Sequence, residues 1–323
     1  MRILVTGGAG YIGSHLADAL IRRGDEVLVI DNLSTGGFEN IRHLQGHPSF
    51  RFINDTILNE SLLERMIPSR DLIFHLAAAV GVHHIVKDPL AAINTNVRGT
   101  EVVLDHAFRY WKRIVIASTS EIYGKATHVP FREDDDRVLG STAVTRWSYS
   151  MSKAIDEHFA FAYAAKGLPV SIVRYFNSYG PRLDERGYGS VVANFARQAL
   201  RGDPITVHGD GKQSRCFTYI SDTVAGTLVA GEADEAVGEA FNIGNPTETP
   251  VLELAQTIKR LARSKSPIQF VPYEAYYGTG FEDPRRRVPA IDKAKRLLGF
   301  EPKVNLEAGL KKTLAWCREH FRH

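Results

Sequence analysis

Tyr149 and Lys153 lie four positions apart and are of types that together can accept a proton. On a helix they would share one face, so the lysine ammonium could lie beside the phenol and favour the phenolate. A phenolate there could take the proton of a hydroxyl group that Thr119, at the end of a predicted strand, could hold. Pairs of this kind are common on amphipathic helices, so the interpretation depends on what else the chain carries.

A cluster of glycines near the N-terminus indicates a dinucleotide site. The segment GGAGYIG, residues 7–13, follows the apolar run 3–5, and the next apolar run, 27–30, ends in Asp31. This order supplies a buried strand, a tight turn that lets a pyrophosphate reach the backbone, a helix N-terminus and a carboxylate for the adenosine ribose. Asp31 would bind a free 2′-hydroxyl and repel a 2′-phosphate, and the first arginine after it is Arg42, so we predict NAD rather than NADP. The residues expected to bind the cofactor here are Gly7, Gly10, Tyr11, Ile12, Gly13, Asp31 and Asn32.

The two patterns together predict the oxidation of an alcohol. A nicotinamide beside Tyr149 would accept a hydride while the phenolate accepts the proton. The positive charge of an oxidised nicotinamide would add to that of Lys153, so we expect the pKa of Tyr149 to fall toward neutrality.

The elements that must position these groups alternate between strands and helices. Apolar runs lie at 3–5, 27–30, 52–53, 72–74, 114–116 and 170–173, and helical patterns lie near 12–23, 60–66, 90–110 and from Tyr149 to about 165. This alternation predicts an α/β fold with a Rossmann-type, doubly wound parallel sheet.

Beyond Asn177 the chain is rich in glycine and proline turns, with two more helices near 252–263 and 306–319, which predicts a smaller, mixed α/β C-terminal substrate lobe. We expect an NAD-binding domain of residues 1–176 with a segment returning at about 221–245, and a substrate lobe of residues 177–220 and 246–323.

Composition and cysteine content argue against several classes of protein. The 323 residues carry a formal net charge of +3, which favours neither a nucleic-acid nor a membrane partner. Cys216 and Cys317 are too few for a disulfide framework and lack metal-ligand spacing, so no metal site is expected. Met1 and Arg2 lead directly into the first strand, without room for a signal peptide, and the longest apolar stretch, residues 72–82, is too short to span a bilayer. We therefore expect a cytoplasmic protein.

Longer stretches give the chain a resemblance to a known family. It resembles the extended short-chain dehydrogenase/reductase superfamily, in its branch of NAD-dependent nucleotide-sugar epimerases and dehydratases. The resembling stretches run almost from one end of the chain to the other and are VTGGAGYIGSHL, VIDNLSTG, HLAAAVGV, NTNVRGT, STSEIYG, YSMSK, VRYFNSYGPR, HGDGKQSRCFTYISD, FNIGNP and RRRVPAIDKAK.

The resemblance implies further site residues and partners. Asp55 and Ile57 would flank the adenine, and Tyr175 to Ser178 would lie between the nicotinamide and sugar sites. The residues expected to line the cofactor are Ala77, Ala78, Ala79 and Asn96, and the candidates for binding the nucleotide diphosphate are Asn177, Arg182 and Arg215. The resemblance also implies a UDP-sugar substrate and a homodimer joined by a four-helix bundle from the helices near 98–110 and 150–165.

Members of this superfamily share a first step, oxidation of the sugar at C4 to a 4-keto sugar, and differ in the next one. A 4,6-dehydratase usually has an Asp and a Glu after the Thr, whereas this chain has Ser120 and Glu121. The order Thr-Ser-Glu resembles UDP-glucuronate decarboxylases, whose Arg-x-Pro-x-Ile segment resembles residues 287–291. Residues 146–147 and 276–283 also resemble the decarboxylase domain of the bacterial aminoarabinose pathway and the plant UDP-apiose/xylose synthases.

These likenesses favour decarboxylation of UDP-glucuronate to UDP-xylose or to a UDP-4-keto-pentose. Oxidation at C4 turns the C5 carboxylate into a β-keto acid, which loses CO2 because the ketone accepts the electrons. Arg287 is the candidate for binding the carboxylate in two places, with Ser120 as a supporting donor. Glu121 would position a water or manage the C5 proton, while Arg285 and Arg286 are expected to form a solvated basic turn.

Two alternatives remain open at this point. The segment 77–82 looks more like that of 4-epimerases than like the Ser/Pro-rich equivalent in UDP-xylose synthases. A UDP-sugar 4-epimerase acting on UDP-glucose and UDP-galactose, or on UDP-glucuronate, is therefore the first alternative, and Glu121 and the direction of Arg287 would decide it. The second is a non-catalytic, NAD(H)-sensing regulator on the same fold. Such regulators often lose the catalytic Tyr or Lys, but this chain has both Tyr149 and Lys153.

Overall fold

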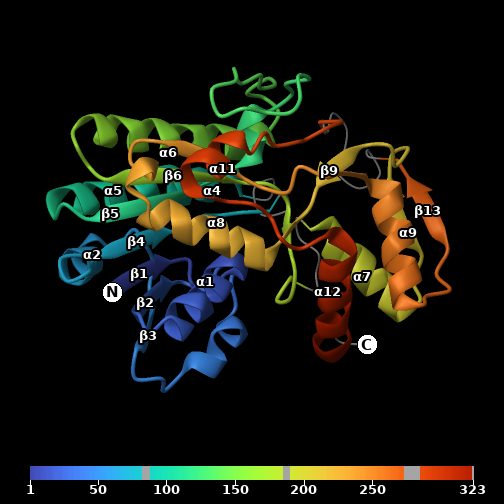
Figure 1. The fold of residues 1–323 in the computed structure, drawn as a ribbon, viewed down its shortest axis with the longest axis horizontal. Coiled ribbons are helices and arrows are strands. Elements are labelled where there is room, and N and C mark those ends of the chain that lie inside the picture. Colours follow the sequence, from blue (N-terminus) through green and yellow to red (C-terminus); the bar gives the residue numbers. More distant parts are fainter. Residues whose placement is uncertain (82–87, 185–189, 273–283, 322–323) are drawn as a thin grey trace.

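The computed structural model describes residues 1–81, 88–184, 190–272 and 284–321, in which a parallel sheet lies between layers of helices (Figure 1). Its strands are β1 (Arg2–Thr6), β2 (Glu26–Asp31), β3 (Phe50–Asn54), β4 (Leu72–His75), β5 (Arg113–Thr119), β6 (Val170–Tyr175) and β11 (Ala240–Ile243). They lie in the order β11-β6-β5-β4-β1-β2-β3, and every neighbouring pair is parallel. The strand order reverses between β1 and β4, which is where ligands bind in folds of this kind.

The strands could be recognised in the sequence because both faces of the sheet are covered. In β1, Ile3 and Val5 belong to the hydrophobic core on one face, and Leu4 between them belongs to the core on the other. Side chains alternate between the two faces of a strand, so a strand that is buried on both sides is apolar throughout.

Helices pack on both faces of the sheet, so it is doubly wound, as predicted. On the Ile3 face lie α1 (Tyr11–Arg22) and α8 (Ile220–Glu232), which contribute Leu16 and Ala230 to the core. On the Leu4 face lie α2 (Glu60–Met66), α5 (Gly99–Arg109) and α6 (Trp147–Ala165). Short 3-10 turns form η1 (Phe38–Asn40), η2 (Arg42–Leu44), η4 (Ser120–Tyr123) and η5 (Asp234–Ala236).

The helix predicted over 90–110 contains a π-helical turn that the sequence analysis did not foresee. It begins as α4 (Pro89–Ile93), widens into the π turn η3 (Asn94–Arg98) and continues as α5. The turn carries Asn96, which is 1% exposed. Ala79 N–H donates to Asn96 Oδ1 at 2.7 Å, and Asn96 Nδ2 donates to Ser152 Oγ at 3.2 Å. The turn therefore joins the segment after β4 to α6.

The smaller lobe lies beside the carboxyl ends of the sheet strands, at the right in Figure 1. Its elements are β7 (Ser178–Tyr179), α7 (Val191–Arg201), β8 (Ile205–His208), β9 (Ser214–Cys216), β10 (Thr218–Tyr219), β12 (Glu248–Pro250), α9 (Val251–Ala262), β13 (Ile268–Val271) and α12 (Leu306–His320). The strands pair two by two, β10 with β7, β12 with β9 and β13 with β8. The expected helices near 252–263 and 306–319 are α9 and α12.

Three helices of the described residues in this half of the chain were not predicted as helices: α7, α11 (Asp292–Leu298) and α8, which lies in the expected returning segment. For α7 the local signals were present. Ser190 accepts a hydrogen bond from Ala193 N–H at 3.3 Å as the N-cap, and Gly202 ends the helix with φ +81°. The glycine and proline turns that follow α7 obscured this pattern.

The segment around 221–245 provides α8 and β11, and β11 pairs with β6 at the edge of the sheet. The chain thus leaves the sheet after β6, enters the lobe and returns. None of the helices within the described ranges combines the length and apolar character needed to cross a membrane.

Candidate active site

A cavity of about 430 Å³ lies at the carboxyl ends of the sheet strands, beside the point where the strand order reverses. Residues directly after β1, β3 and β4 and at the ends of β2, β5 and β6 line it, together with the first turns of α6. The residues expected to bind a cofactor or do chemistry that line it are Gly7, Gly10, Tyr11, Ile12, Gly13, Asp31, Asn32, Asp55, Ile57, Ala77, Ala78, Thr119, Ser120, Glu121, Tyr149, Lys153 and Tyr175. The structure therefore brings two distant sequence patterns into one cavity.

The glycine turn leaves the backbone open to this cavity. Gly7 has φ +71°, a conformation that favours glycine, and a side chain at Gly13 would place its Cβ 2.2 Å from the Gly7 carbonyl oxygen. Gly10 is the N-cap of α1, and no side chain caps this helix end. The N–H groups of the first turn of α1 thus meet a wall of the cavity without covering side chains, which fits an anionic ligand such as a pyrophosphate.

Asp31 stands at the end of β2 and is 8% exposed. Its Oδ2 accepts a hydrogen bond from Ala9 N–H at 2.9 Å, and its Oδ1 accepts one from Leu33 N–H at 2.8 Å. Burial raises the pKa of Asp31, and these backbone hydrogen bonds act in the opposite direction. The glycine turn and the carboxylate are therefore held in one fixed arrangement, as an adenosine ribose site requires.

Tyr149 lies in the first turn of α6, and Thr119 at the end of β5 hydrogen-bonds to it. Burial raises the pKa of Tyr149 above its usual range, the charges of Glu121 and Asp156 raise it further, and the Thr119 hydrogen bond lowers it. For the protein itself, burial and the two carboxylates outweigh the Thr119 hydrogen bond, so the pKa of Tyr149 lies above its usual value. The fall toward neutrality was expected from Lys153 acting together with an oxidised nicotinamide. The contribution of a bound nicotinamide stays a prediction.

Lys153 is one helical turn further along α6 and is 3% exposed. Its Nζ donates a hydrogen bond to Asp156 Oδ2 at 2.7 Å. The ammonium is therefore bound on one side by a carboxylate while it also lines the cavity.

Glu121 lies between two arginines at the wall of the same cavity. Its Oε1 is 3.2 Å from Arg287 Nη1, and its Oε2 is 3.8 Å from Arg146 Nη2. Both arginines are 7% exposed, and the Arg146 guanidinium lies 5.3 Å from the ring centre of Trp147. Arg146 belongs to a resembling stretch but had no predicted role, although it lies directly before the helical turn that carries Tyr149.

Arg285 and Arg286 differ from Arg287, as expected. Arg285 pairs with Asp210 at 3.0 Å and Arg286 pairs with Glu248 at 2.7 Å, and both arginines are exposed. Only the third arginine of the run reaches the cavity among the residues described.

Five predicted residues lie outside the cavity lining, and one of them, Phe176, is fully buried. Ala79 and Asn96 bind each other behind the wall. Arg182 Nη2 donates to Asp18 at 2.7 Å, and Arg215 Nη1 donates to the Ser214 carbonyl at 2.7 Å. Of the diphosphate candidates, the structure places Asn177 at the cavity but not these two arginines. The resembling segment 276–283 and Val82 lie outside the described residues.

Several lining residues were not predicted as site residues from the sequence. Polar ones are Ser34, Thr35, Thr56, Thr95, Ser118, Arg146, Asp184 and Ser190, whereas Ser178, which was predicted, also lines the cavity. Ser34 and Thr35 follow Asp31 by three and four residues in the stretch VIDNLSTG. Their place at the cofactor site could therefore have been predicted from the sequence. Ser190 is the N-cap of α7 and enters from the lobe, which local sequence does not reveal.

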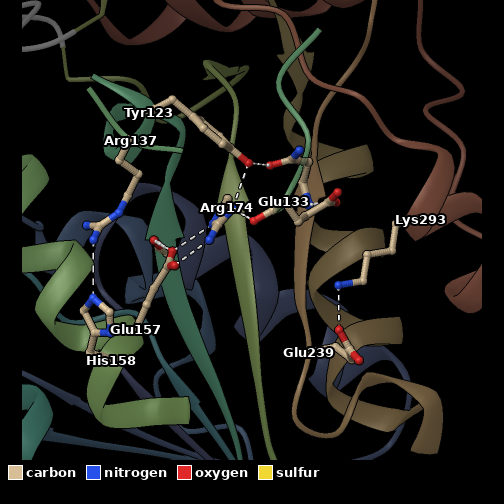
Figure 2. A network of polar contacts seen from close by, with 10 residues as sticks. Tyr123, Glu133, Arg137, Glu157, His158, Arg174, Glu239 and Lys293 are labelled. Carbon is tan, nitrogen blue, oxygen red and sulfur yellow. Dashed lines mark hydrogen bonds and ion pairs between the residues drawn. The ribbon is translucent and has the colours of Figure 1, made fainter. Parts of the chain in front are cut away.

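A buried ion pair lies next to the cavity and contacts one of its lining residues, Ser118. Arg174 on β6 binds Glu157 on α6 through two hydrogen bonds, of 2.9 and 2.7 Å, and also donates to Tyr123 at 2.9 Å (Figure 2). Ser118, which lines the cavity, donates its hydroxyl proton to Glu157. The cavity wall at the end of β5 is thus tied to the core of the molecule.

Within the described part of the chain, no group of three His, Cys, Asp or Glu side chains is arranged to hold a metal ion.

Comparison with known proteins places this geometry among nucleotide-sugar enzymes. Residues 4–313 match the model of a family described as GDP-mannose 4,6 dehydratase. A UDP-N-acetyl-alpha-D-glucosaminuronate decarboxylase of Bacillus cytotoxicus is 45% identical over 319 residues, which cover 98% of each chain. UDP-glucuronic acid decarboxylase 1 of Arabidopsis thaliana is 43% identical over 327 residues, covering 99% of this chain and 71% of the plant protein.

A solved structure is similar over the same length. It is that of a UDP-glucuronic acid 4-epimerase from Bacillus cereus in complex with UDP-glucuronic acid and NAD, with a TM-score of 0.88 and 30% identity. The match covers 99% of this chain and 100% of the other.

Proposed function

Because the chain belongs to the GDP-mannose 4,6-dehydratase family, among the extended short-chain dehydrogenase/reductases, we propose that it uses NAD to decarboxylate a UDP-hexuronate. UDP-glucuronate is the first substrate we name, with UDP-xylose or a UDP-4-keto-pentose as product. The observation that carries this proposal is the pair of buried guanidinium groups, Arg146 and Arg287, beside Glu121 in the cavity that includes Tyr149. Guanidinium groups are suited to binding a carboxylate, here the one on C5 of the sugar.

The residues around the glycine turn fit NAD. The bare first turn of α1 would bind the pyrophosphate and the Asp31 carboxylate the adenosine ribose, with Asp55 and Ile57 beside the adenine. Bound NAD supplies the hydride acceptor for oxidation at C4 and the hydride for any later reduction. The similar epimerase structure was solved with NAD.

The first proton transfer belongs to Tyr149. Thr119 would hold the C4 hydroxyl, and the phenolate oxygen of Tyr149 would accept its proton as the C4–H hydride leaves. The Lys153 side chain, one helical turn away, would balance the negative charge on the phenol. The resulting 4-keto sugar has its carboxylate in the β position to the ketone.

The second step breaks the bond between C5 and the carboxylate carbon. Its electron pair moves toward the C4 ketone and forms an enolate, and CO2 leaves. Arg287 would hold the carboxylate in place before that step, with Arg146 beside it, and Ser120 would donate a hydrogen bond. Glu121 would then position a water that gives its proton to C5. Asn177 is the described candidate for contact with the diphosphate.

Product mass tests this function. Purified protein is incubated with UDP-glucuronate, UDP-N-acetylglucosaminuronate, UDP-glucose and UDP-galactose in separate reactions with NAD. Loss of one CO2 from a uronate substrate supports the proposal, and comparison of the two uronates shows whether a 2-acetamido group is required. Unchanged masses with no change of the sugar would contradict it.

A UDP-sugar 4-epimerase is the second candidate. The likeness to the Bacillus cereus 4-epimerase and the segment 77–82, of which Val80 and Gly81 line the cavity, favour it. In this reaction the 4-keto sugar would rotate and take the hydride back on its other face. An unchanged mass with inverted C4 stereochemistry would identify it.

We also propose that the protein works as a homodimer in the cytoplasm. Apolar side chains are exposed on one helix of the expected bundle, α6, where Met151 is 43% and Phe161 is 39% exposed. Cys216 and Cys317 are both free thiols, and a chain without a disulfide between its cysteines suits a reducing compartment. Sedimentation of wild type against Phe161→Glu tests the dimer, which the variant should weaken.

A further inference from the structure

Asp156 is a buried carboxylate on α6 that the reaction described above does not use. Its side chain is fully buried, and its Oδ2 lies 2.7 Å from Lys153 Nζ. It follows Tyr149 by seven positions and Lys153 by three, so all three side chains lie on one side of the helix. The Lys153 ammonium thus has a carboxylate on one side and the cavity on the other.

A row of buried polar groups continues from Asp156 into the sheet. Thr100 of α5 faces the Asp156 carboxyl group, and its Oγ1 lies 3.0 Å from His75 Nε2 on β4. His75 Nδ1 lies 2.7 Å from Thr6 Oγ1 on β1. Burial, together with the Lys153 charge, lowers the pKa of His75 to about 3, so the ring is neutral at pH 7. The negative charge of the row is therefore that of Asp156.

The charged groups around Tyr149 and Asp156 come from three elements. On α6 they are Lys153 and Glu157, after β5 Glu121, and on β6 Arg174, which binds Glu157. Burial raises the pKa of Asp156, and its neighbour Lys153 lowers it.

We propose that Asp156 is a positioning residue for the Tyr149 and Lys153 pair: its carboxylate fixes the ammonium at the cavity wall and offsets part of the positive charge that acts on the phenol. The proposal rests on the proposed function only in taking Tyr149 as the proton acceptor. Without Asp156 the full charge of the ammonium would act on Tyr149 and stabilise the phenolate at lower pH. The ammonium would also lose its buried counter-ion.

Titration of Tyr149 measures this effect without any sugar. The protein with saturating NAD is titrated by ultraviolet difference absorbance of phenolate, and the curve of Tyr149→Phe is subtracted to remove the other tyrosines. For Asp156→Asn we expect the midpoint of the Tyr149 titration to fall by about one pH unit, because the variant lacks a negative charge near the phenol. Asp156→Glu keeps the charge and should restore a midpoint close to that of wild type.

Asp222→Asn is the matched control. Asp222 is also a buried helical aspartate, but it accepts hydrogen bonds from Lys303 and Val304 N–H in the lobe at 3.0 and 2.9 Å. Its replacement should leave the Tyr149 midpoint unchanged. If Asp156→Asn fails to fold, Asp156→Ser, which keeps an oxygen for the ammonium but removes the charge, is titrated with the same expectation.

Kinetics on the UDP-sugar that the protein converts give a second readout. In the pH profile of kcat/KM, Asp156→Asn should move the acid limb to lower pH. A midpoint and an acid limb that stay at the wild-type pH, with only a lower melting temperature, would show that Asp156 is merely structural and overturn the proposal. A shifted midpoint in a protein that converts none of the sugars would leave this proposal standing and reject the proposed function.

Discussion

At the scale of single residues, Glu121 occupies an unusual place. It is a carboxylate held between Arg146 and Arg287 in a cavity where the proposed substrate brings a carboxylate of its own. Two anions beside these arginines repel each other, so binding of a uronate is expected to displace Glu121 from at least one guanidinium group. Glu121 would then be released toward C5, where a proton is needed after CO2 has left.

Replacement of Arg287 tests the carboxylate site. Arg287→Ala should lower kcat/KM for the uronate. The expected loss of transition-state stabilisation is about 2–5 kcal/mol, because the substrate charge would be buried without its partner. A substrate with an uncharged C6 hydroxyl should suffer less. Steady-state assays of product by mass measure both effects.

Arg286→Ala is the control for that change. It removes the same charge from the neighbouring residue, whose pairing with Glu248 is at the surface. Its kcat/KM should stay close to that of wild type. Equal losses of kcat/KM in the two variants would mean that the net positive charge of this region, rather than a carboxylate-binding site at Arg287, explains the loss.

Asp31 sets the expected choice of cofactor. Titration of the cofactor-free protein should show at least tenfold tighter binding of NAD than of NADP, a difference of about 1.4 kcal/mol. In Asp31→Asn the preference should narrow, because the charge that repels a 2′-phosphate is gone while the side chain keeps its shape. A preference of the wild type for NADP would reject this role of Asp31.

At the scale of elements, the polar network in Figure 2 joins α6, β5 and β6 with the loop after η4. Tyr123 donates to Asn242 Oδ1 at 2.7 Å, and Glu133 accepts from Asn242 N–H at 2.8 Å. The network thereby reaches β11 as well. Since the same pair, Arg174 and Glu157, contacts Ser118 at the cavity, the position of the site depends on this packing.

Breaking the buried pair should be costly. Glu157→Gln leaves the Arg174 charge buried and is expected to lower the free energy of unfolding by about 3–5 kcal/mol. Glu239→Gln breaks the more exposed pair with Lys293, also drawn in Figure 2, and should cost no more than about 1 kcal/mol. Urea denaturation of both variants compares the costs, and equal values would contradict the assigned difference.

The sequence was most informative where structure is local. The glycine turn, the apolar strands and the helix that carries Tyr149 and Lys153 each follow from a few neighbouring residues, and the doubly wound sheet and the family are confirmed. The approach of Arg146 to Glu121 depends on how α6 packs against β5 and could not be read from spacing. The ion pair of Asp156 with Lys153 could not be predicted as a buried one either, because burial is a property of the folded chain.

At the scale of the whole molecule, stability should depend on pH through His75. The folded protein keeps the pKa of this buried ring near 3, whereas the unfolded chain has an ordinary histidine value near 6.5. Between these values the unfolded state binds the extra proton, so the His75 contribution is fully present above pH 6.5 and is lost as the pH falls toward 3. The loss is about 1.4 kcal/mol per pH unit.

His75→Gln should remove this part of the pH dependence, because glutamine keeps polar atoms for Thr6 and Thr100 but does not titrate. Urea denaturation at several pH values between 4 and 7 compares the slopes of the two proteins. An identical slope in the variant would show that other groups control acid sensitivity. The variant itself is expected to be less stable at pH 7, since the fit of the ring is lost.

The return of the chain to the sheet has a consequence for its synthesis on the ribosome. When residues up to β6 have emerged, β6 forms the edge of the sheet, and the face later covered by α8 still exposes residues such as Phe74 and Val115. Val224 and Ala230 of α8 lie 49 and 55 residues after Tyr175, and Phe241 of β11 lies 66 residues after it, so these surfaces are covered only when that much more chain has been added. During that interval the nascent sheet offers an unpaired edge and an apolar face to other chains. Chaperone binding should therefore concentrate on nascent chains that end between β6 and β11.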